Sequence, residues 1–374
     1  MANDKPFIVL GQGIAGVSLV WALMQQGVEA EHIVWVGQGG EERATDGTGE
    51  RAIGGETGAS WTPVALINPA TGPSAKLIPD AEVALSHTYS LVDWVQTSNI
   101  LHPSHDITVL RPAASQDMCA KMKQRFQQDP WPEGWAQWLE PGECADKFPG
   151  VFCEHGALWI HKGGCLPMPS FLAAARQKAA DLGVQVEHSA NADITEWLDK
   201  GIVICATGAA TYGLTVDSAL AWPEINLHRV KGQLMTIRLA NSGDVTNASH
   251  YPRTAISMKG YLAPTETPGV VAVGSTYEHH FEHTDFDEDG RQKLLAIAKS
   301  ILPNARFDEE SIRGWAAVRV HQSPERLPVI TQHSTISGLY AFTGFGSKGL
   351  TLSPAAAVRF TQRLLRASPT TPAR

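Results

Sequence analysis

The chain has 374 residues, of which 43% are hydrophobic and 18% charged, and this balance excludes a disordered or fibrous protein. Its 30 Lys and Arg and 38 Asp and Glu give a formal net charge of −8. That charge argues against a nucleic-acid partner, because neutralising phosphates requires a basic face. At about 150 residues per domain, the length suggests two or three domains.

The cysteines and apolar runs bear on the compartment. The 5 cysteines are odd in number and contain no Cys-x-x-Cys pair, so we expect neither a disulfide framework nor a structural zinc site, and a reducing cytoplasm suits the chain best. No run reaches the ~18 unbroken apolar residues that a membrane helix needs. We therefore expect a cytoplasmic protein without a membrane span.

The N-terminal residues predict a strand, a glycine turn and a helix. Phe7–Leu10 is a short apolar run typical of a buried parallel strand. Residues 11–16 (Gly-Gln-Gly-Ile-Ala-Gly) follow at once, helical periodicity covers 17–26, and a strand at 33–36 completes a βαβ unit. In this position Gly-x-Gly-x-x-Gly is a dinucleotide fingerprint, in which the glycines allow the turn, the approach of a pyrophosphate and close helix packing. The alternative is a tight turn that binds no nucleotide.

One part of the fingerprint is absent. An acidic residue at the end of the second strand normally bonds the ribose hydroxyls, but that position falls on Val36 or Gly37. Glu41 and Glu42 follow in a loop (37–60) rich in Gly, Thr and Glu, and either could substitute. The pattern therefore predicts pyrophosphate binding and leaves the ribose contact open.

The middle of the chain reads as a second α/β passage followed by strands and turns. Residues 129–150 contain four prolines and three tryptophans, which indicates an aromatic loop region. Helices are predicted over 81–98, 169–182 and 289–302, and strands over 184–188, 202–206, 230–237, 260–263 and 270–273.

A second glycine-rich segment, residues 344–350 (Gly-Phe-Gly-Ser-Lys-Gly-Leu), opens a predicted final helix that extends to about Leu365. Such a helix start directs backbone amides and the positive end of the helix dipole toward an electron-rich group. A flavin needs this where its pyrimidine side becomes anionic on reduction, whereas a nicotinamide has no evident use for it. The alternative is a helix start used only for packing.

Together these segments resemble the D-amino-acid oxidase superfamily, in a pattern close to glycine oxidase and similar to the flavin domain of the tRNA 5-methylaminomethyl-2-thiouridine biosynthesis protein. The matching segments are 11–16, 59–60 with 65–69, 203–208, 231–233, 260–264 with 273–277, 315–319 and 344–349. The resemblance implies non-covalent FAD and an α/β fold, with a Rossmann-like FAD-binding domain interleaved with a mixed-sheet α+β substrate domain. The implied divisions are 1–80, 155–225 and 310–374 for FAD, and 81–154 and 226–309 for the substrate.

The resemblance also implies the site residues. Arg319 falls where the family keeps an arginine for the substrate carboxylate, and a planar guanidinium gives a bidentate contact that a lysine cannot. Tyr261 and Tyr277 match pocket-lining positions, or else pack a core as strand aromatics. Lys348 could stabilise reduced flavin or reach the substrate, or else be a solvated helix-start residue. The residues expected to bind FAD are Gly11, Gln12, Gly13, Ile14, Ala15, Gly16, Ala59, Ser60, Thr207, Gly208, Gly344, Gly346, Ser347, Lys348, Gly349 and Leu350.

Three further features qualify this assignment. Ser347 replaces an arginine that glycine oxidase uses as a second carboxylate contact, which counts against glycine-like substrates. The loop after the second strand is longer than the family pattern suggests. His279 and His283 have a helical i, i+4 spacing that could ligate a metal, but they follow a strand and lack a metalloprotease motif, so we expect no metal.

The function predicted from these residues is FAD-dependent oxidation of an amino acid or N-substituted glycine-type amine. Arg319 holds the carboxylate, hydride passes from the α-carbon to flavin N5, the imine hydrolyses, and O2 or another acceptor takes the electrons. One alternative is oxidative removal of a carboxymethyl group from a modified tRNA wobble uridine. The closing glycine segment favours it, whereas the net charge and the absence of a methyltransferase domain oppose it. The other is a flavin-binding protein without turnover, which predicts bulky side chains around Arg319. The oligomeric state is not predicted.

Overall fold

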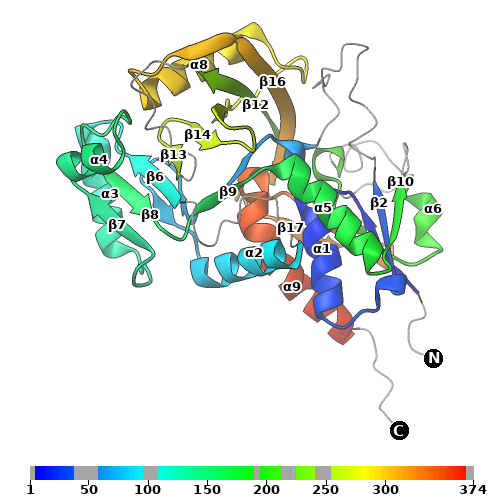
Figure 1. The fold of residues 1–374 in the computed structure, drawn as a ribbon. Helices are drawn as coiled ribbons and strands as arrows, with labels where there is room; N and C mark the ends of the chain where they lie inside the picture. The colour runs from blue at the N-terminus through cyan, green and yellow to red at the C-terminus, as the bar shows by residue number, and fades with distance from the viewer. Residues whose placement is uncertain are drawn as a thin grey trace.

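The fold consists of two large sheets with helices packed on them (Figure 1). The computed structural model describes residues 5–37, 58–95, 108–188, 194–211, 222, 225–240 and 254–367. Most of the predicted loop 37–60, including Glu41 and Glu42, lies outside these residues. The α/β class with a Rossmann-like part and a mixed sheet is confirmed.

The first sheet has six strands in the order β10-β2-β1-β11-β18-β17. The neighbours from β10 to β18 are parallel, and β17 is antiparallel to β18. Its strands are β1 (Phe7–Leu10), β2 (Ile33–Gly37), β10 (Gln185–His188), β11 (Ile202–Cys205), β17 (Val329–Gln332) and β18 (Leu339–Thr343). The apolar runs of β1, β2 and β11 are buried because helices or loops cover both faces of the sheet.

Four helices supply the larger of the two cores on this sheet. They are α1 (Ile14–Gln25), α2 (Ala81–Val95), α5 (Met168–Asp181) and α9 (Gly349–Ala367). On the other face, α6 (Thr195–Leu198) and Trp222 contribute to a smaller apolar cluster. The carboxyl ends of the parallel strands β1, β11 and β18 thus lie at the same edge of the sheet, next to the starts of α1 and α9.

The second sheet has eight strands in the order β16-β12-β15-β14-β13-β6-β8-β7. Its pairs are antiparallel except β13 with β6. Its strands are β6 (Thr108–Pro112), β7 (Ala136–Leu139), β8 (Ala157–Ile160), β12 (Leu227–Leu239), β13 (Thr254–Ser257), β14 (Tyr261–Pro264), β15 (Val270–Gly274) and β16 (Phe307–Gln322). Helices α8 (Glu288–Ile301) and α4 (Pro141–Lys147) contribute to the core on one face (Figure 1).

Smaller elements complete the fold. Helix α3 (Gln116–Gln128) contributes Cys119 and Met122 to the core on the second face. Two short antiparallel pairs join β3 (Ala65–Ile67) to β9 (Gly164–Leu166) and β4 (Ala70–Thr71) to β5 (Lys76–Leu77). In the described part of the chain, no helix combines the length and apolarity needed to cross a bilayer.

Every predicted helix and strand named above corresponds to an observed element, but the aromatic loop prediction for 129–150 is wrong in part. That stretch contains the edge strand β7 and the helix α4. Helix α4 starts with Pro141, a residue suited to the first helical position, and Glu143 closes a capping box with Glu140. The prolines that suggested a loop therefore include a helix-start signal.

Two elements pack against a different sheet from the one that the predicted domain boundaries give them. Helix α2 follows residue 80, yet its buried Leu85 and Leu91 belong to the core of the six-stranded sheet. Strand β16 extends past residue 310, yet it pairs with β12 over almost its whole length. The residue boundaries of the two domains therefore stay a prediction.

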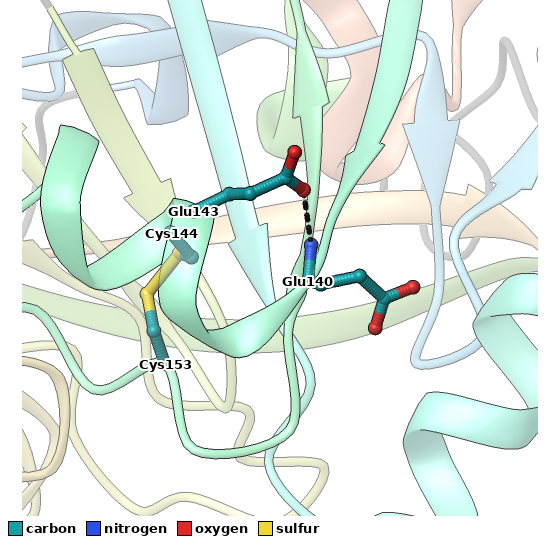
Figure 2. The surroundings of a disulfide bond; sticks show 4 residues. All are labelled: Glu140, Glu143, Cys144 and Cys153. Atoms are coloured by element: carbon teal, nitrogen blue, oxygen red, sulfur yellow. Dashed lines mark hydrogen bonds between the residues drawn. A yellow bond between two sulfur atoms is a disulfide. The ribbon is translucent and has the colours of Figure 1, made fainter.

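Cys144 and Cys153 form a disulfide that the sequence did not predict (Figure 2). The nine-residue separation gave no motif, but α4 and the turn after it bring the two Cα atoms to 6.0 Å. The expectation of cysteines without disulfides is thus wrong for this pair. Cys205 is free and buried, and burial raises the pKa of its thiol to about 12, so it behaves as a small apolar residue.

Candidate functional site

The turn between β1 and α1 leaves room for no side chain at two of its three glycines. Gly11 has φ +112°, and a Cβ there would lie 2.4 Å from the Ala206 carbonyl oxygen. A Cβ on Gly16 would lie 1.9 Å from the Gly11 carbonyl oxygen. The turn therefore passes directly over the end of β11, and α1 packs directly onto the turn, as the fingerprint requires.

The start of α1 presents backbone donors next to one hydroxyl. Its N-cap, Gly13, has no side chain to satisfy the first amides, and the Ile14 amide donates to Ser60 Oγ at 3.0 Å. A Cβ on Gly13 would lie 2.8 Å from the same oxygen. Amides at a helix start together with a hydroxyl fit an anionic pyrophosphate.

The closing glycine segment lies beside this turn although more than 300 residues separate the two in sequence. Gly344 and Gly346 both have positive φ, and α9 begins at Gly349. A Cβ on Gly349 would lie 3.0 Å from Ile14 Cγ2. One turn into each helix, the hydroxyls of Ser18 and Ser353 are 2.8 Å apart. The two helix starts thus form adjoining sets of amides that an elongated dinucleotide could contact together.

The remaining residues predicted to bind the cofactor lie close to these helix starts. Thr207 and Gly208 follow β11, where Thr207 Oγ1 lies 2.8 Å from Thr211 Oγ1 and the Gly208 carbonyl accepts a bond from Thr343 at 3.4 Å. Ala59 lies in a 3-10 turn with Ser60 and packs against the cluster formed by Leu234, Trp315 and Ala317. This turn therefore connects the second sheet with the edge of the first sheet at which α1 and α9 begin, which we call the nucleotide edge.

Arg319 lies on the face of the second sheet that is turned toward this edge. Directly paired residues of antiparallel strands share a face, and the pairs Val230–Arg319, Gly232–Ala317 and Leu234–Trp315 place Arg319 on the same face as the cluster on which Ala59 packs.

The guanidinium of Arg319 is held by three neighbours. Nη1 donates to Ser275 Oγ at 3.3 Å and Nη2 to the Thr276 carbonyl oxygen at 3.0 Å, while Cζ lies 4.4 Å from the centre of the Tyr277 ring. A Cβ on Gly232 would lie 2.7 Å from Nη2, so the absence of a side chain there makes room for the group. Only part of the donor capacity of the guanidinium is used in these contacts.

The two predicted pocket tyrosines differ in their surroundings. The Tyr261 hydroxyl donates to the Val64 carbonyl oxygen at 3.0 Å, and burial raises the pKa of this phenol. Tyr277 is 62% exposed and stacks on Arg319. Tyr261 therefore has a structural hydrogen bond, and Tyr277 stands at the rim beside the guanidinium.

The side chains of Ser347 and Lys348 are exposed, and no hydrogen bond or ion pair joins the Lys348 ammonium to the rest of the described chain. The Lys348 amide donates to the Phe345 carbonyl at 3.0 Å. These positions present backbone at the helix start, and the role of the lysine stays a prediction.

A buried network that the sequence did not assign positions the Arg319 partner Thr276. The Gln233 amide donates to Thr276 Oγ1 at 2.9 Å, the Thr276 amide donates back to the Gln233 carbonyl at 3.1 Å, and Thr276 Oγ1 donates to Glu278 at 2.6 Å. The Lys-Gly-Gln triplet gave only a family resemblance, because its partners lie more than 40 residues further along the chain.

The same network contains an almost completely buried ammonium. Lys231 is 1% exposed and bonds Asp287 at 2.8 Å, with Glu278 at 3.6 Å. Burial alone would raise the Asp287 pKa, but hydrogen bonds from Lys231, the Gly290 amide and Gln233 hold it well below its usual range. The segment that follows β15 and carries Thr276 is therefore fixed by charged contacts with Lys231 and Asp287.

The histidines set aside as a metal candidate take a different arrangement. The segment with His279 and His283 is not helical, and His279 Nδ1 instead lies 2.8 Å from His228 Nε2. The His321 ring is 5.2 Å from that of His228, and burial and the nearby His228 lower the pKa of His321. His228, Arg229, His279, His280 and Glu282 line an open hollow of about 570 Å³, so this end of the sheet combines imidazoles and a guanidinium with a carboxylate.

Curated proteins are similar to this chain over all or part of its length. A tRNA 5-methylaminomethyl-2-thiouridine biosynthesis bifunctional protein of Thiobacillus denitrificans is 25% identical to this chain. The alignment covers 93% of this chain and 54% of the relative's length. Glycine oxidase of Pseudomonas putida is 30% identical over 44% of this chain and 45% of its own. The chain spans about half the length of these curated relatives.

Solved structures share the fold at low identity. Glycine oxidase from Bacillus cereus has a TM-score of 0.67 at 18% identity, covering 98% of this chain and 96% of the other. Iminodiacetate oxidase from Chelativorans sp. has a TM-score of 0.68 at 17% identity, covering 97% and 96%.

The family model described as FAD dependent oxidoreductase matches residues 7–363, and this range contains both glycine-rich helix starts, Arg319 and the network that holds it. The chain belongs to the D-amino-acid oxidase family of FAD-dependent oxidoreductases.

Proposed function

We propose that this enzyme oxidises a carboxylate-bearing amine, either an amino acid or an N-substituted glycine. The observation that carries the proposal is the Arg319 guanidinium, which lies on the sheet face turned toward the nucleotide edge and is held there by the Thr276 carbonyl and Ser275. An arginine whose position is set by a backbone carbonyl and a hydroxyl is a preorganised hydrogen-bond donor to a carboxylate. Bound FAD supplies the two-electron oxidising chemistry.

The residues divide the remaining work between binding and positioning. The amides at the starts of α1 and α9, with Ser60, would hold the pyrophosphate and the anionic side of the flavin. Arg319 would bind the substrate carboxylate and so fix the neighbouring α-carbon, which converts an encounter into a positioned reaction. The amine must be neutral for its lone pair to assist loss of hydride. Either O2 or another acceptor would then take the electrons.

The open side of the site favours a substituent on the amine. Tyr277 is 62% exposed, and the hollow lined by His228, Arg229 and His279 adjoins the sheet face of Arg319, because His228 pairs with His321 two residues further along β16. An N-substituted glycine could place its carboxylate on Arg319 and its N-substituent toward this hollow.

A second candidate is the oxidative removal of a carboxymethyl group from a modified tRNA uridine. Relatives named for tRNA 5-methylaminomethyl-2-thiouridine biosynthesis support it, as does the exposed Lys348 at the closing helix start. The formal charge of −8 weighs against a large polyanion. A flavoprotein without turnover is less well supported, because Gly232 and Ser275 beside Arg319 are small rather than obstructing.

The test is anaerobic reduction of the purified, FAD-loaded protein by candidate substrates. The reduction is measured as the loss of flavin absorbance. We expect N-substituted glycines or amino acids to reduce the flavin, and Arg319→Lys to raise the half-saturating concentration at least about tenfold because the bidentate contact is lost. Arg313→Lys, on the same strand but exposed, is the matched control. Reduction by carboxymethyl-modified tRNA alone would establish the second candidate, and an unchanged half-saturation in Arg319→Lys would refute the carboxylate contact.

A further inference from the structure

The end of β2 lacks the group that dinucleotide fingerprints use to hold a ribose. The acidic side chain expected there normally accepts hydrogen bonds from the ribose hydroxyls. In this chain β2 ends at Gly37, which has no side chain to offer. FAD dependence is nevertheless a property of the family to which the chain belongs, so another acceptor has to serve at this place.

Gln12 occupies the space that a side chain at position 37 would need. A Cβ on Gly37 would lie 2.6 Å from Gln12 Cγ, 2.9 Å from Cδ and 3.1 Å from Cβ. Gln12 is the second residue of the glycine turn, so its backbone is already part of the fingerprint. The glycine at 37 and the long side chain at 12 are therefore sterically complementary: an ordinary residue at 37 would displace the glutamine.

The Gln12 amide group has one end satisfied and the other unsatisfied. Its Nε2 donates to the Glu187 carbonyl of the neighbouring strand β10 at 3.5 Å. Its Oε1 is buried and has no hydrogen-bond partner among the residues that the structure describes, and the residue as a whole is 5% exposed. Buried polar atoms in folded proteins are nearly always paired, and leaving one unpaired is costly. An orphaned acceptor at the end of β2 is what a ribose hydroxyl would satisfy.

We propose that the side-chain carbonyl of Gln12 accepts the hydrogen bond from the adenosine ribose of FAD, in place of the missing acidic residue. The acceptor reaches the ribose position from the glycine turn rather than from β2. A neutral amide also adds no negative charge next to the pyrophosphate. The proposal depends on FAD binding alone and is independent of which amine the enzyme oxidises.

The test measures binding to the apoprotein rather than turnover. FAD affinity is followed by quenching of flavin fluorescence, and the ribose contact is isolated by competition with ADP, 2′-deoxy-ADP and 3′-deoxy-ADP. For the wild-type protein we expect ADP to compete better than at least one deoxy analogue, by roughly 3- to 15-fold, the range of one neutral hydrogen bond. Gln12→Met keeps the volume and removes the acceptor, so it should weaken FAD by a similar factor and abolish the preference for ADP.

Three further variants keep the test decisive. Gln12→Glu keeps the acceptor and should retain the ADP preference, so it reports on the contact even if Gln12→Met does not fold. Gly37→Glu alone should lower the affinity for FAD because its Cβ meets Gln12. Gln12→Ala combined with Gly37→Glu should recover the preference for ADP over the deoxy analogues through the usual acidic residue. Gln185→Met, an exposed position on the adjoining strand, is the control. An ADP preference that is absent in the wild type, or unchanged in Gln12→Met, would overturn the proposal.

Discussion

In the six-stranded sheet the candidate site is made mainly of backbone, whereas in the eight-stranded sheet it is made of side chains on one face. Glycines mark both regions, but what surrounds them differs. At Gly11 and Gly16 an added Cβ would meet carbonyl oxygens of the main chain. At Gly232 it would meet the Arg319 guanidinium, and at Gly274 it would meet the Tyr261 and Leu234 side chains.

This difference indicates how each region would respond to change. A backbone carbonyl in a packed strand or turn cannot move aside without disturbing the fold. The far end of a flexible side chain such as the Arg319 guanidinium can move aside, at the cost of its own contacts. Substitutions at Gly11 and Gly16 should therefore remove cofactor and fold together, and a substitution at Gly232 should separate substrate binding from cofactor binding.

The largest effect is expected for Gly16→Ala. Its Cβ would lie 1.9 Å from the Gly11 carbonyl oxygen, so α1 has to separate from the turn, an overpacking cost at or above about 3 kcal/mol. We expect protein that purifies without flavin colour and melts at a lower temperature by differential scanning calorimetry. Gly142→Ala, where an added Cβ has open space, should match the wild type. A yellow, stable Gly16→Ala protein would remove the distinction between the two regions.

The next effect in size is expected for Asp287→Asn, which breaks the pair with the buried Lys231. Glu278 remains 3.6 Å from the ammonium, so we expect a loss of about 1–3 kcal/mol in the free energy of unfolding at pH 7, less than for a buried charge left wholly unpaired. The measurement is urea denaturation.

The pH dependence of this pair has a defined sign. The Asp287 pKa is lowered in the folded protein, so its contribution is present above the ordinary aspartate pKa and is lost as the pH falls toward the folded value. The stability gap between wild type and Asp287→Asn should therefore narrow between about pH 5 and pH 2. A stability gap that stays constant over this range would mean that the ion pair does not stabilise the segment that carries Thr276.

A smaller effect on stability, but a specific one on substrate, is expected for Gly232→Ala. The added Cβ would lie 2.7 Å from Arg319 Nη2 and should push the guanidinium away from Thr276. We expect the half-saturating concentration of the carboxylate substrate to rise roughly tenfold, equivalent to about 1.4 kcal/mol, with FAD content unchanged by absorbance. Loss of FAD in this variant would show that the two regions are not separable.

The smallest effect is expected for Lys348→Ala. The side chain is exposed at the start of α9, and exposed charges contribute little. FAD affinity and the rate of flavin reduction, measured by stopped-flow absorbance, should change by less than about threefold. A larger change would mean that this lysine reaches a ligand, and the closing segment would then act through a side chain as well as through its backbone.

Prediction from the sequence worked best where the signal was local. The glycine turn before α1 and the glycine-rich start of α9 were found because tight turns and helix starts depend on a few neighbouring residues. Arg319 was found through a family resemblance, and its surroundings agree with an anion-binding role without testing it. The aromatic loop over 129–150 was wrong in part, since a proline at a helix start and an edge strand carry weak periodic signals.

The sequence by itself determined the order of the strands and helices that have strong periodicity, the two glycine-rich segments and the family. Only the tertiary structure decided that the starts of α1 and α9 adjoin, that Cys144 meets Cys153, that Lys231 is buried against Asp287, and that Gln12 fills the space beside Gly37. The physical reason is that local sterics and periodicity act over a few residues, whereas these contacts form only when packed elements bring together residues that are not neighbours in the sequence.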